Sequence, residues 1–390
     1  MIVRSRYIFT STGVVDGYLC IEDGKIVSIQ SDYEGIVDID CGDKRVIPGI
    51  IDTHNHGTMG YGLFSETKDH KREFLGYLKG LASQGVTACL PTADIDFFET
   101  IAHVAKTPID GAIPIGIHSE GPYLNRVGEK GVDTGHPDID LDYCKEMVDK
   151  AGGMLKLVAI APELPKAKEA IEYFCSQGIR CAFAHSNQLY KEALESFRWG
   201  ITVTTHTANV MEGMHHRHMG GLGACLLNDE VYNELICDGL HVSNEMIEIM
   251  LRVKKNPLDK ILMVSDSTPM SGAPLGRYKL DGHFEVNIDE KGFCLSDTGR
   301  LMGSTVPVIK GIKNLVENFD LSLSDVLKMS SRNPAIVYGA KSKGELAVGK
   351  DADFVIIDDQ YNALSTYREG VCIYNKEKDQ KIFNSDFLPK

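Results

Sequence analysis

Two histidines one residue apart follow a short apolar run in the stretch PGIIDTHNHG, residues 48 to 57. Alternate residues of an extended chain point to the same side, so His54 and His56 can face one site together. Converging imidazole nitrogens are typical ligands of zinc and related transition metals. Such a pair also occurs by chance in surface turns, so its meaning depends on what else the fold brings beside it.

Histidines and acidic residues recur at the ends of other apolar runs. Six of the runs end in or are followed by such side chains: His54 and His56, His118 and Glu120, His185, His206, His241, and Asp266. Packing explains one histidine of this kind but not the whole set. Imidazole and carboxylate together favour zinc or another divalent transition metal. His118 is expected either beside this metal site or as a packed structural histidine.

The elements that must position these side chains alternate along the chain. Eight runs rich in Val and Ile lie at residues 47–52, 86–92, 112–121, 155–163, 179–186, 201–209, 234–242 and 260–268. Helical patterns lie between several of them, for example at 69–85 and 242–255. This order predicts an α/β protein with a (β/α)8 TIM-type barrel, whose chemistry collects at the carboxyl ends of the strands. An open doubly wound sheet is the alternative.

The two ends of the chain have a different character. Residues 1–47 and 345–390 contain short strand patterns with tight turns, such as the Asp-Gly pairs at 16–17 and 23–24. We therefore expect one small β-sandwich domain built from 1–47 plus 345–390. The barrel domain is expected to span 48–344.

Composition narrows the partners and the compartment. The 390 residues carry a formal net charge of −14, which argues against general binding to nucleic acid or to anionic membranes. A local basic site for a small anion stays open. The ten cysteines form no C-x-x-C pair and no apolar run reaches 18 residues. These features predict a cytoplasmic protein with reduced cysteines.

Several stretches taken together resemble the amidohydrolase superfamily, and within it the deacetylases of amino-sugar phosphates. They are PGIIDTHNHG, HSEGPYLN (118–125), AHS (184–186), THTANVMEGMHHR (205–217), CDGLHV (237–242) and VSDS (264–267). The resemblance covers nearly the whole chain. It implies a metal-dependent enzyme that hydrolyses N-acetylglucosamine 6-phosphate to glucosamine 6-phosphate and acetate. It also implies that this enzyme is a homodimer.

The resemblance also implies residue roles. Glu120, His185 and His206 would hold one metal ion, and His54, His56 and Asp266 would hold a second ion that shares Glu120. Zinc is the expected metal, with iron, manganese or cobalt as alternatives and one or two ions per subunit. Asp266 would be the general base, and His241 would contact the substrate near the acetyl carbonyl. The phosphate would be bound by Asn209, the backbone N–H of Val210, and Arg217, the last across the dimer interface.

Amide hydrolysis calls for the same groups on chemical grounds. It needs an activated water, a positive partner for the carbonyl oxygen and an acid for the departing nitrogen. Arg217 and the neighbouring His215, His216 and His218 offer cations for a phosphate in an acidic protein.

The chain departs from the deacetylase pattern in three places. Lys130 and Gly131 match the usual KGAH motif, but the next histidine is His136. HHRHMG stands where HHREPG is typical, and SDS where TDA is usual. The roles of His136 and of the histidines beside Arg217 therefore stay open. Alternative substrates are N-acetylgalactosamine 6-phosphate or another N-acyl amino sugar. A cyclic amidohydrolase of the dihydroorotase or adenine deaminase type and a non-catalytic sugar-phosphate binder are the rival functions.

Overall fold

The barrel strands lie at the centre of the molecule. The computed structural model describes residues 1–64, 67–125, 137–280 and 284–387. The parallel strands are β6 (Ile50–Asp52), β9 (Val86–Cys89), β10 (Ile113–Pro114), β11 (Ile117–Glu120), β12 (Leu155–Ile160), β13 (Arg180–Phe183), β14 (Ile201–Thr204), β15 (Tyr232–Ile236) and β16 (Ile261–Val264). Strands β10 and β11 both come from the predicted run 112–121, so each of the eight runs supplies a strand.

Hydrogen bonding divides these strands into two parallel sheets. One has the order β10-β9-β6 and the other runs from β11 to β16 in sequence order. Two isolated bridges join the sheets, one between Thr92 after β9 and His118 in β11, and one between Asn55 after β6 and Ser267 after β16. Three of the four bridged residues follow the carboxyl ends of strands, so both seams lie toward that end of the barrel. The parallel strands alternating with helices confirm the predicted α/β architecture.

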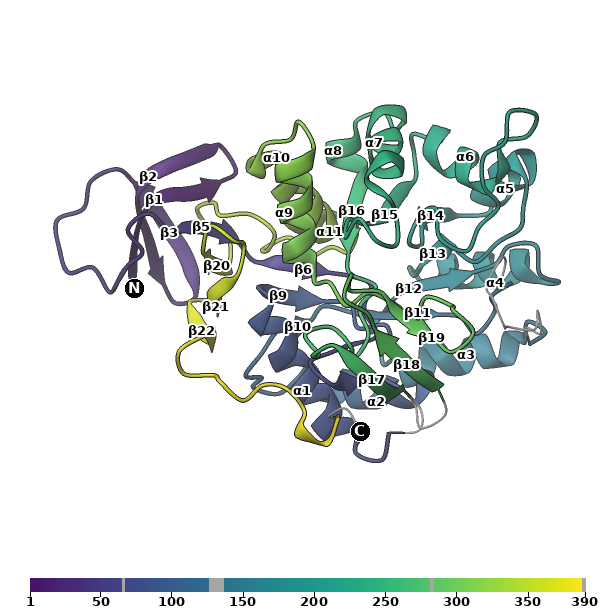
Figure 1. Cartoon of the computed structure of the whole chain (residues 1–390), viewed down its shortest axis with the longest axis horizontal. Helices are drawn as coiled ribbons and strands as arrows, with labels where there is room; N and C mark the ends of the chain where they lie inside the picture. The colour runs from purple at the N-terminus through teal and green to yellow at the C-terminus, as the bar shows by residue number, and fades with distance from the viewer. Residues whose placement is uncertain (65–66, 126–136, 281–283, 388–390) are drawn as a thin grey trace.

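Helices alternate with the strands and cover the outside of the barrel (Figure 1). They are α1 (His70–Ser83), α2 (Ile95–Val104), α3 (Leu141–Lys150), α4 (Ala167–Ser176), α5 (Tyr190–Phe197), α6 (Gly220–Leu227), α7 (Asn244–Val253), α8 (Pro257–Lys260), α9 (Val308–Asn318), α10 (Leu323–Leu327) and α11 (Asn333–Val337), with a π-helical turn at Lys328–Arg332 between the last two.

Helices α1 and α7 illustrate how the sequence sets their limits. The Asp69 side chain accepts a hydrogen bond from the backbone N–H of Arg72 at the start of α1, and Gly85 has a left-handed φ of 84° just past its end. Between them, Phe74 and Leu78 are fully buried. Ser243 caps α7 in the same way, as its position in the sequence predicts.

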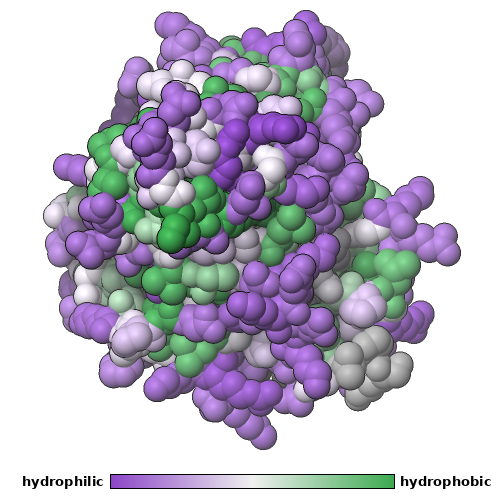
Figure 2. Space-filling model, turned by 90° about the vertical axis from the view of Figure 1, so that its left-hand side faces the viewer, coloured by the Kyte–Doolittle hydropathy of each residue, from purple (hydrophilic) through white to green (hydrophobic). Residues whose placement is uncertain are grey.

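Both ends of the chain build a second sheet at one side of the barrel (Figure 1). Its strands are β1 (Ile2–Thr10), β2 (Gly13–Glu22), β3 (Lys25–Gln30), β4 (Ile39–Asp40), β5 (Arg45–Pro48), β20 (Phe354–Ile357), β21 (Ala363–Arg368) and β22 (Val371–Asn375). They pair continuously in the order β22-β21-β20-β5-β1-β2-β3, with β4 beside β1. Side chains from both halves, such as Leu19 and Phe354, pack into one apolar cluster. Seen from this side, hydrophilic residues cover most of the surface, with hydrophobic ones between them (Figure 2).

The run IPGIID serves both sheets, although the sequence presents it as one apolar run. Its first part belongs to β5 and its last part to β6, with Gly49 between them. A Cβ at Gly49 would collide with the side chain of Thr87 in β9, so the chain passes there only without a side chain.

Two further small sheets follow barrel strands. The first pairs β7 (Gly57–Thr58) with β8 (Tyr61–Gly62), and the second consists of β17 (Gly276–Leu280), β18 (Phe284–Ile288) and β19 (Cys294–Ser296). All ten cysteines are free, and seven are buried, as expected. No helix in the described ranges combines the length and apolar character needed to cross a membrane.

Candidate active site

Four of the predicted metal ligands occupy equivalent positions. His54, His185, His206 and Asp266 each lie two residues past the last residue of a barrel strand, namely of β6, β13, β14 and β16. Glu120 is the last residue of β11. Because the strands are parallel, these positions meet at one end of the barrel. The structure thus brings together side chains that lie more than 200 residues apart in the sequence, from His54 to Asp266.

The backbone turns sharply at three of these positions. His185, His206 and Asp266 have left-handed φ values of 43°, 27° and 50°. Such conformations cost a non-glycine residue about 1–3 kcal/mol and concentrate at functional sites. Here they end the extended chain and turn the side chains toward one another at the barrel mouth.

Glu120 stands between two groups of histidines. Its Oε1 lies 2.9 Å from His206 Nε2 and 3.1 Å from His185 Nε2, and these two nitrogens are 3.1 Å apart. Its other oxygen, Oε2, lies 3.0 Å from His56 Nε2 and 3.5 Å from His54 Nε2. One carboxylate therefore faces both predicted ligand sets.

The second ligand set is tied together by the backbone as well. Asp266 Oδ1 lies 3.5 Å from the Nε2 atoms of both His54 and His56. The Asp266 N–H donates to the His54 carbonyl at 2.8 Å, across the seam between β16 and β6. Beside them, Ser265 Oγ donates to Asp52 at 2.5 Å. The closure of the barrel thus fixes the spacing of this set.

A divalent cation fits both groups. Ligands of a tetrahedral zinc ion, at about 2.0 Å from the metal, are roughly 3.3 Å apart. The atoms that face one another here are 2.9 to 3.5 Å apart. His54 Nε2 is buried and has no hydrogen-bond partner among the described residues, although it points between two carboxylates. Imidazole nitrogens and carboxylate oxygens together form a donor set typical of zinc and similar metals.

The charges of the site reinforce one another. Burial raises the pKa of Glu120, but the charge of His54 and hydrogen bonds from His185 and His206 outweigh it and hold this pKa well below its usual range. Burial acts to lower the pKa of His56, whereas Asp266 and Glu120 raise it to about 9. The carboxylates are therefore ionised at neutral pH and attract positive charge.

His118 lies behind the cluster. Its ring packs edge-on against His54, with the ring centres 4.6 Å apart, and its Nδ1 is 3.1 Å from Thr92 Oγ1. Burial and the charge of His54 hold its pKa well below the usual value, so His118 is neutral. It supports the ring of His54 from behind, in keeping with the expectation of a neighbour of the metal site.

Two acidic residues belong to the site although the sequence did not single them out. Glu234 in β15 is fully buried and lies 2.9 Å from His54 Nδ1. Asp238 accepts from His241 Nδ1 at 2.8 Å and from Ser304 Oγ at 2.9 Å. The available signal was a pair of carboxylates inside the otherwise apolar run ELICDG, where a charged residue needs a buried partner.

His241 is oriented by these contacts. Asp238 also accepts the backbone N–H groups of Leu240 and His241, which fixes the turn after β15. The opposite nitrogen of the ring, His241 Nε2, is buried and without a partner among the described residues. The ring thus has one nitrogen anchored and the other free for a further contact.

The residues expected to bind phosphate lie on the loop between β14 and α6. Asn209 donates from its backbone and its side chain to the His206 carbonyl, and Val210 has a left-handed φ of 47°. Arg217 is exposed, outside the buried cluster, and its Nη1 lies 2.7 Å from His216 Nε2. His215 and His218 pair through their backbones, 2.8 and 3.0 Å. Lys130, Gly131 and His136 lie outside the described residues.

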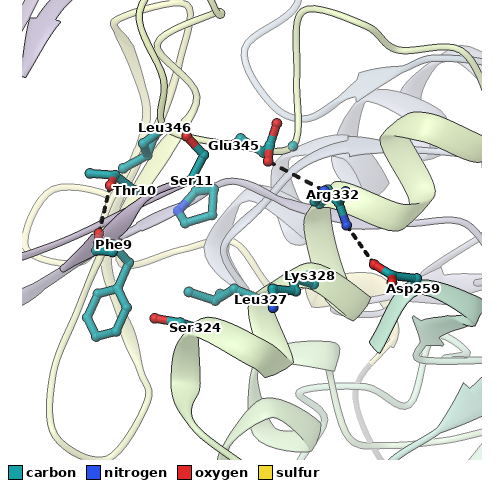
Figure 3. Close-up of a pocket in the computed structure, with 13 residues that line it drawn as sticks. Phe9, Thr10, Ser11, Asp259, Ser324, Leu327, Lys328, Arg332, Glu345 and Leu346 are labelled. Atoms are coloured by element: carbon teal, nitrogen blue, oxygen red, sulfur yellow. Dashed lines mark hydrogen bonds and ion pairs between the residues drawn. The ribbon is translucent and has the colours of Figure 1, made fainter. Parts of the chain in front are cut away.

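A separate cavity of about 490 Å³ is lined by the side chains drawn in Figure 3 and lies near the amino ends of barrel strands. Among the residues that line it, Pro48 and Asp259 precede the strands β6 and β16, whereas the metal-site residues follow them. Arg332 in this cavity pairs with Asp259 at 2.9 Å and with Glu345 at 3.6 Å. These charges satisfy one another at the boundary between the terminal sheet and the barrel.

Known proteins resemble this chain over nearly its full length. A family model described as the amidohydrolase family matches residues 45–386. The N-acetylglucosamine-6-phosphate deacetylase of Lysinibacillus sphaericus is 30% identical over 385 residues, covering 95% of this chain and 97% of that protein. The N-acetylgalactosamine-6-phosphate deacetylase of Escherichia coli O157:H7 is 29% identical, covering 95% and 98%. The crystal structure of N-acetylglucosamine-6-phosphate deacetylase from Thermotoga maritima has a TM-score of 0.81 at 28% identity, covering 96% and 100%.

Proposed function

The chain belongs to the amidohydrolase family, and on that premise we propose that it hydrolyses the N-acetyl group of N-acetylglucosamine 6-phosphate. The products are glucosamine 6-phosphate and acetate. Relatives named for this reaction align with 91% to 97% of the chain. The observation that carries the proposal is the position of Glu120, with one oxygen toward His185 and His206 and the other toward His54 and His56.

Two groups of side chains are proposed to bind metal ions. Glu120, His185 and His206 would hold one divalent ion, and His54, His56 and Asp266 would hold a second that shares Glu120, with zinc as the proposed metal. A divalent ion at such a site lowers the pKa of bound water to about 7 and polarises a carbonyl oxygen. The remaining chemistry belongs to side chains of the chain itself.

Asp266 is the proposed general base and acid. Its carboxylate accepts a proton from the attacking water and returns it to the sugar nitrogen as the C–N bond breaks. Surrounding histidine charges hold the pKa of Asp266 well below its usual range despite burial, so it begins the cycle ionised. His241, anchored by Asp238 through Nδ1, directs Nε2 at the acetyl carbonyl oxygen, where the imidazolium form of the ring donates a hydrogen bond to the negative charge that develops.

The phosphate is bound at the loop after β14. The left-handed backbone at Val210 supports a role for its N–H group as a hydrogen-bond donor to the phosphate. The Arg217 guanidinium supplies positive charge. Because Arg217 is exposed, we further propose that the enzyme is a homodimer in which this residue reaches the partner subunit's site. The epimer N-acetylgalactosamine 6-phosphate is a second candidate substrate, since a relative named for it is 29% identical over 95% of the chain.

A substrate panel tests the function. Purified protein supplied with zinc is assayed for acetate release from both N-acetylhexosamine 6-phosphates, from unphosphorylated N-acetylglucosamine, and for ring opening of dihydroorotate. We expect the highest kcat/KM with N-acetylglucosamine 6-phosphate. The variant Asp266→Asn should lose activity by several powers of ten while keeping its fold, which excludes a contaminating enzyme. Metal and sugar phosphate bound without turnover of any N-acyl substrate would contradict the proposal.

A further inference from the structure

We propose that Glu234 is a positioning residue that commits His54 to the second metal ion, so that two-ion binding depends on it while the first ion does not. The inference rests on the proposed metal-dependent function and extends it to a residue that binds neither metal nor substrate.

Glu234 contacts the ring nitrogen of His54 that points away from the site. Its Oε2 lies 2.9 Å from His54 Nδ1 and accepts the backbone N–H of His206 at 3.3 Å. Both Glu234 and His54 are fully buried. The opposite ring nitrogen, His54 Nε2, lies 3.5 Å from a carboxylate oxygen of Glu120 and 3.5 Å from one of Asp266.

This contact fixes which nitrogen of His54 carries the hydrogen. An ionised carboxylate only accepts hydrogen bonds, so His54 Nδ1 must be the donor. In the neutral ring, Nε2 then presents a lone pair toward the two carboxylates, which is the form that binds a metal. A carboxylate behind a ligating histidine also makes that histidine a stronger ligand.

The first ligand set has a different environment. His206 Nδ1 is buried and has no hydrogen-bond partner within the described part of the chain. The hydrogen bond between Glu234 and His206 uses the backbone N–H of His206 and not its ring, whose Nε2 faces Glu120. Loss of the Glu234 charge should therefore weaken the ion at His54 and leave the ion at His206.

The burial of Glu234 calls for such a role. A fully buried carboxylate in an apolar strand is costly unless it is paired. Its Oε1 has no hydrogen-bond partner among the described residues, so hydrogen bonding alone does not satisfy it. A cation held through His54 provides the compensating charge, and glutamine would fill the same volume without needing one.

Zinc binding to Glu234→Gln and Glu234→Asp tests the proposal. Each protein is dialysed to equilibrium against buffered free zinc over a range of concentrations, and the bound metal is measured by elemental analysis. Wild type should take up two ions. Both variants should keep the first ion at its wild-type affinity and bind the second about 10–100-fold more weakly. In Glu234→Asp the carboxylate keeps its charge, but the shorter side chain moves its oxygens away from His54. This variant therefore tests the position of the carboxylate separately from its charge.

Asp353→Asn is the matched control. Asp353 is 3% exposed, directly precedes β20 and pairs with Lys343 at 2.9 Å. Its variant should melt at a lower temperature yet bind two ions as wild type does. Unchanged affinity for the second ion in both Glu234 variants, or equal weakening of both ions, would overturn the proposal. A wild-type protein that binds a single zinc ion would also overturn the proposed role of Glu234. A wild-type protein that binds no zinc would contradict the proposed function itself.

Discussion

At the scale of single residues, the site divides into a buried part and an exposed part. The metal-site residues are held by neighbours on several strands, as His54 is held by Glu234 and His118. Arg217, by contrast, is exposed on a loop, with His216 as a neighbour. In the proposed function, the buried residues carry out the hydrolysis and the exposed ones distinguish one substrate from another.

Arg217→Ala tests the role of the exposed part. A hydrogen bond to a charged group contributes about 1.5–3 kcal/mol, which corresponds to roughly 10–100-fold in kcat/KM. We expect a loss of this size for N-acetylglucosamine 6-phosphate, mainly through KM, and little change for unphosphorylated N-acetylglucosamine. Steady-state kinetics with both substrates measure the difference.

Arg198→Ala is the control for this experiment, because Arg198 is an exposed arginine paired with Glu195 on the neighbouring helix α5. It should behave as wild type with both substrates. Equal losses with and without the phosphate in Arg217→Ala would mean that this side chain does not read the phosphate.

At the scale of elements, regular patterns made most of the architecture predictable. Eight apolar runs correctly indicated the barrel strands, and the spacing of His54 and His56 correctly placed both toward one site. The small sheets around β7 and β17 were not predicted. Strands β7 and β8 have two residues each and leave no pattern, whereas β17 and β18 alternate polar and apolar residues and were overlooked. Glu234 was missed because its role depends on His54, which lies 180 residues away in the sequence. Asp238 contacts His241 only three residues further on, so the sequence held that pair but its spacing was not used.

The run at residues 47–52 shows that an element boundary can also depend on contacts that are distant in the sequence. Its composition suggests one strand, but Gly49 separates a strand of the terminal sheet from a strand of the barrel. The break arises from close approach to Thr87, which lies 38 residues later in the sequence. Only the folded structure reveals that neighbour.

Gly49→Ala should therefore destabilise the fold. The added methyl group would collide with the Thr87 side chain, and overpacking of this kind costs about 1–3 kcal/mol. Urea unfolding followed by circular dichroism measures the free energy of unfolding. Adding Thr87→Ala should recover part of the loss, because it removes two of the three atoms that the new methyl group meets.

Gly213→Ala serves as the reference, since a Cβ at Gly213 meets no atom within 4 Å. It should change the free energy of unfolding by less than about 0.5 kcal/mol. A Gly49→Ala protein as stable as this reference would show that the junction between the two sheets tolerates a side chain.

At the scale of the whole molecule, the barrel concentrates negative charge at one end of its core. Glu120, Asp266 and Glu234 lie together there, and their contacts in the described ranges are with histidines and backbone N–H groups. Burial also raises the pKa of the adjacent Asp52 to about 6, against hydrogen bonds from Ser265. Divalent cations offset this charge, so metal binding and folding should be coupled.

Chelation tests that coupling. A ligand present at 100 times its dissociation constant stabilises the folded state by about 2.7 kcal/mol. With an unfolding entropy of roughly 2.1 cal/mol/K per residue, a chain of 390 residues should lose about 3 °C in melting temperature per ion removed. Calorimetry of the protein with zinc, and after dialysis against a chelator, measures this shift. Zinc should restore both the melting temperature and acetate release, whereas calcium, which prefers oxygen ligands, should restore neither. An unchanged melting temperature after complete metal removal would mean that the histidines and carboxylates at the barrel mouth stabilise one another without a cation.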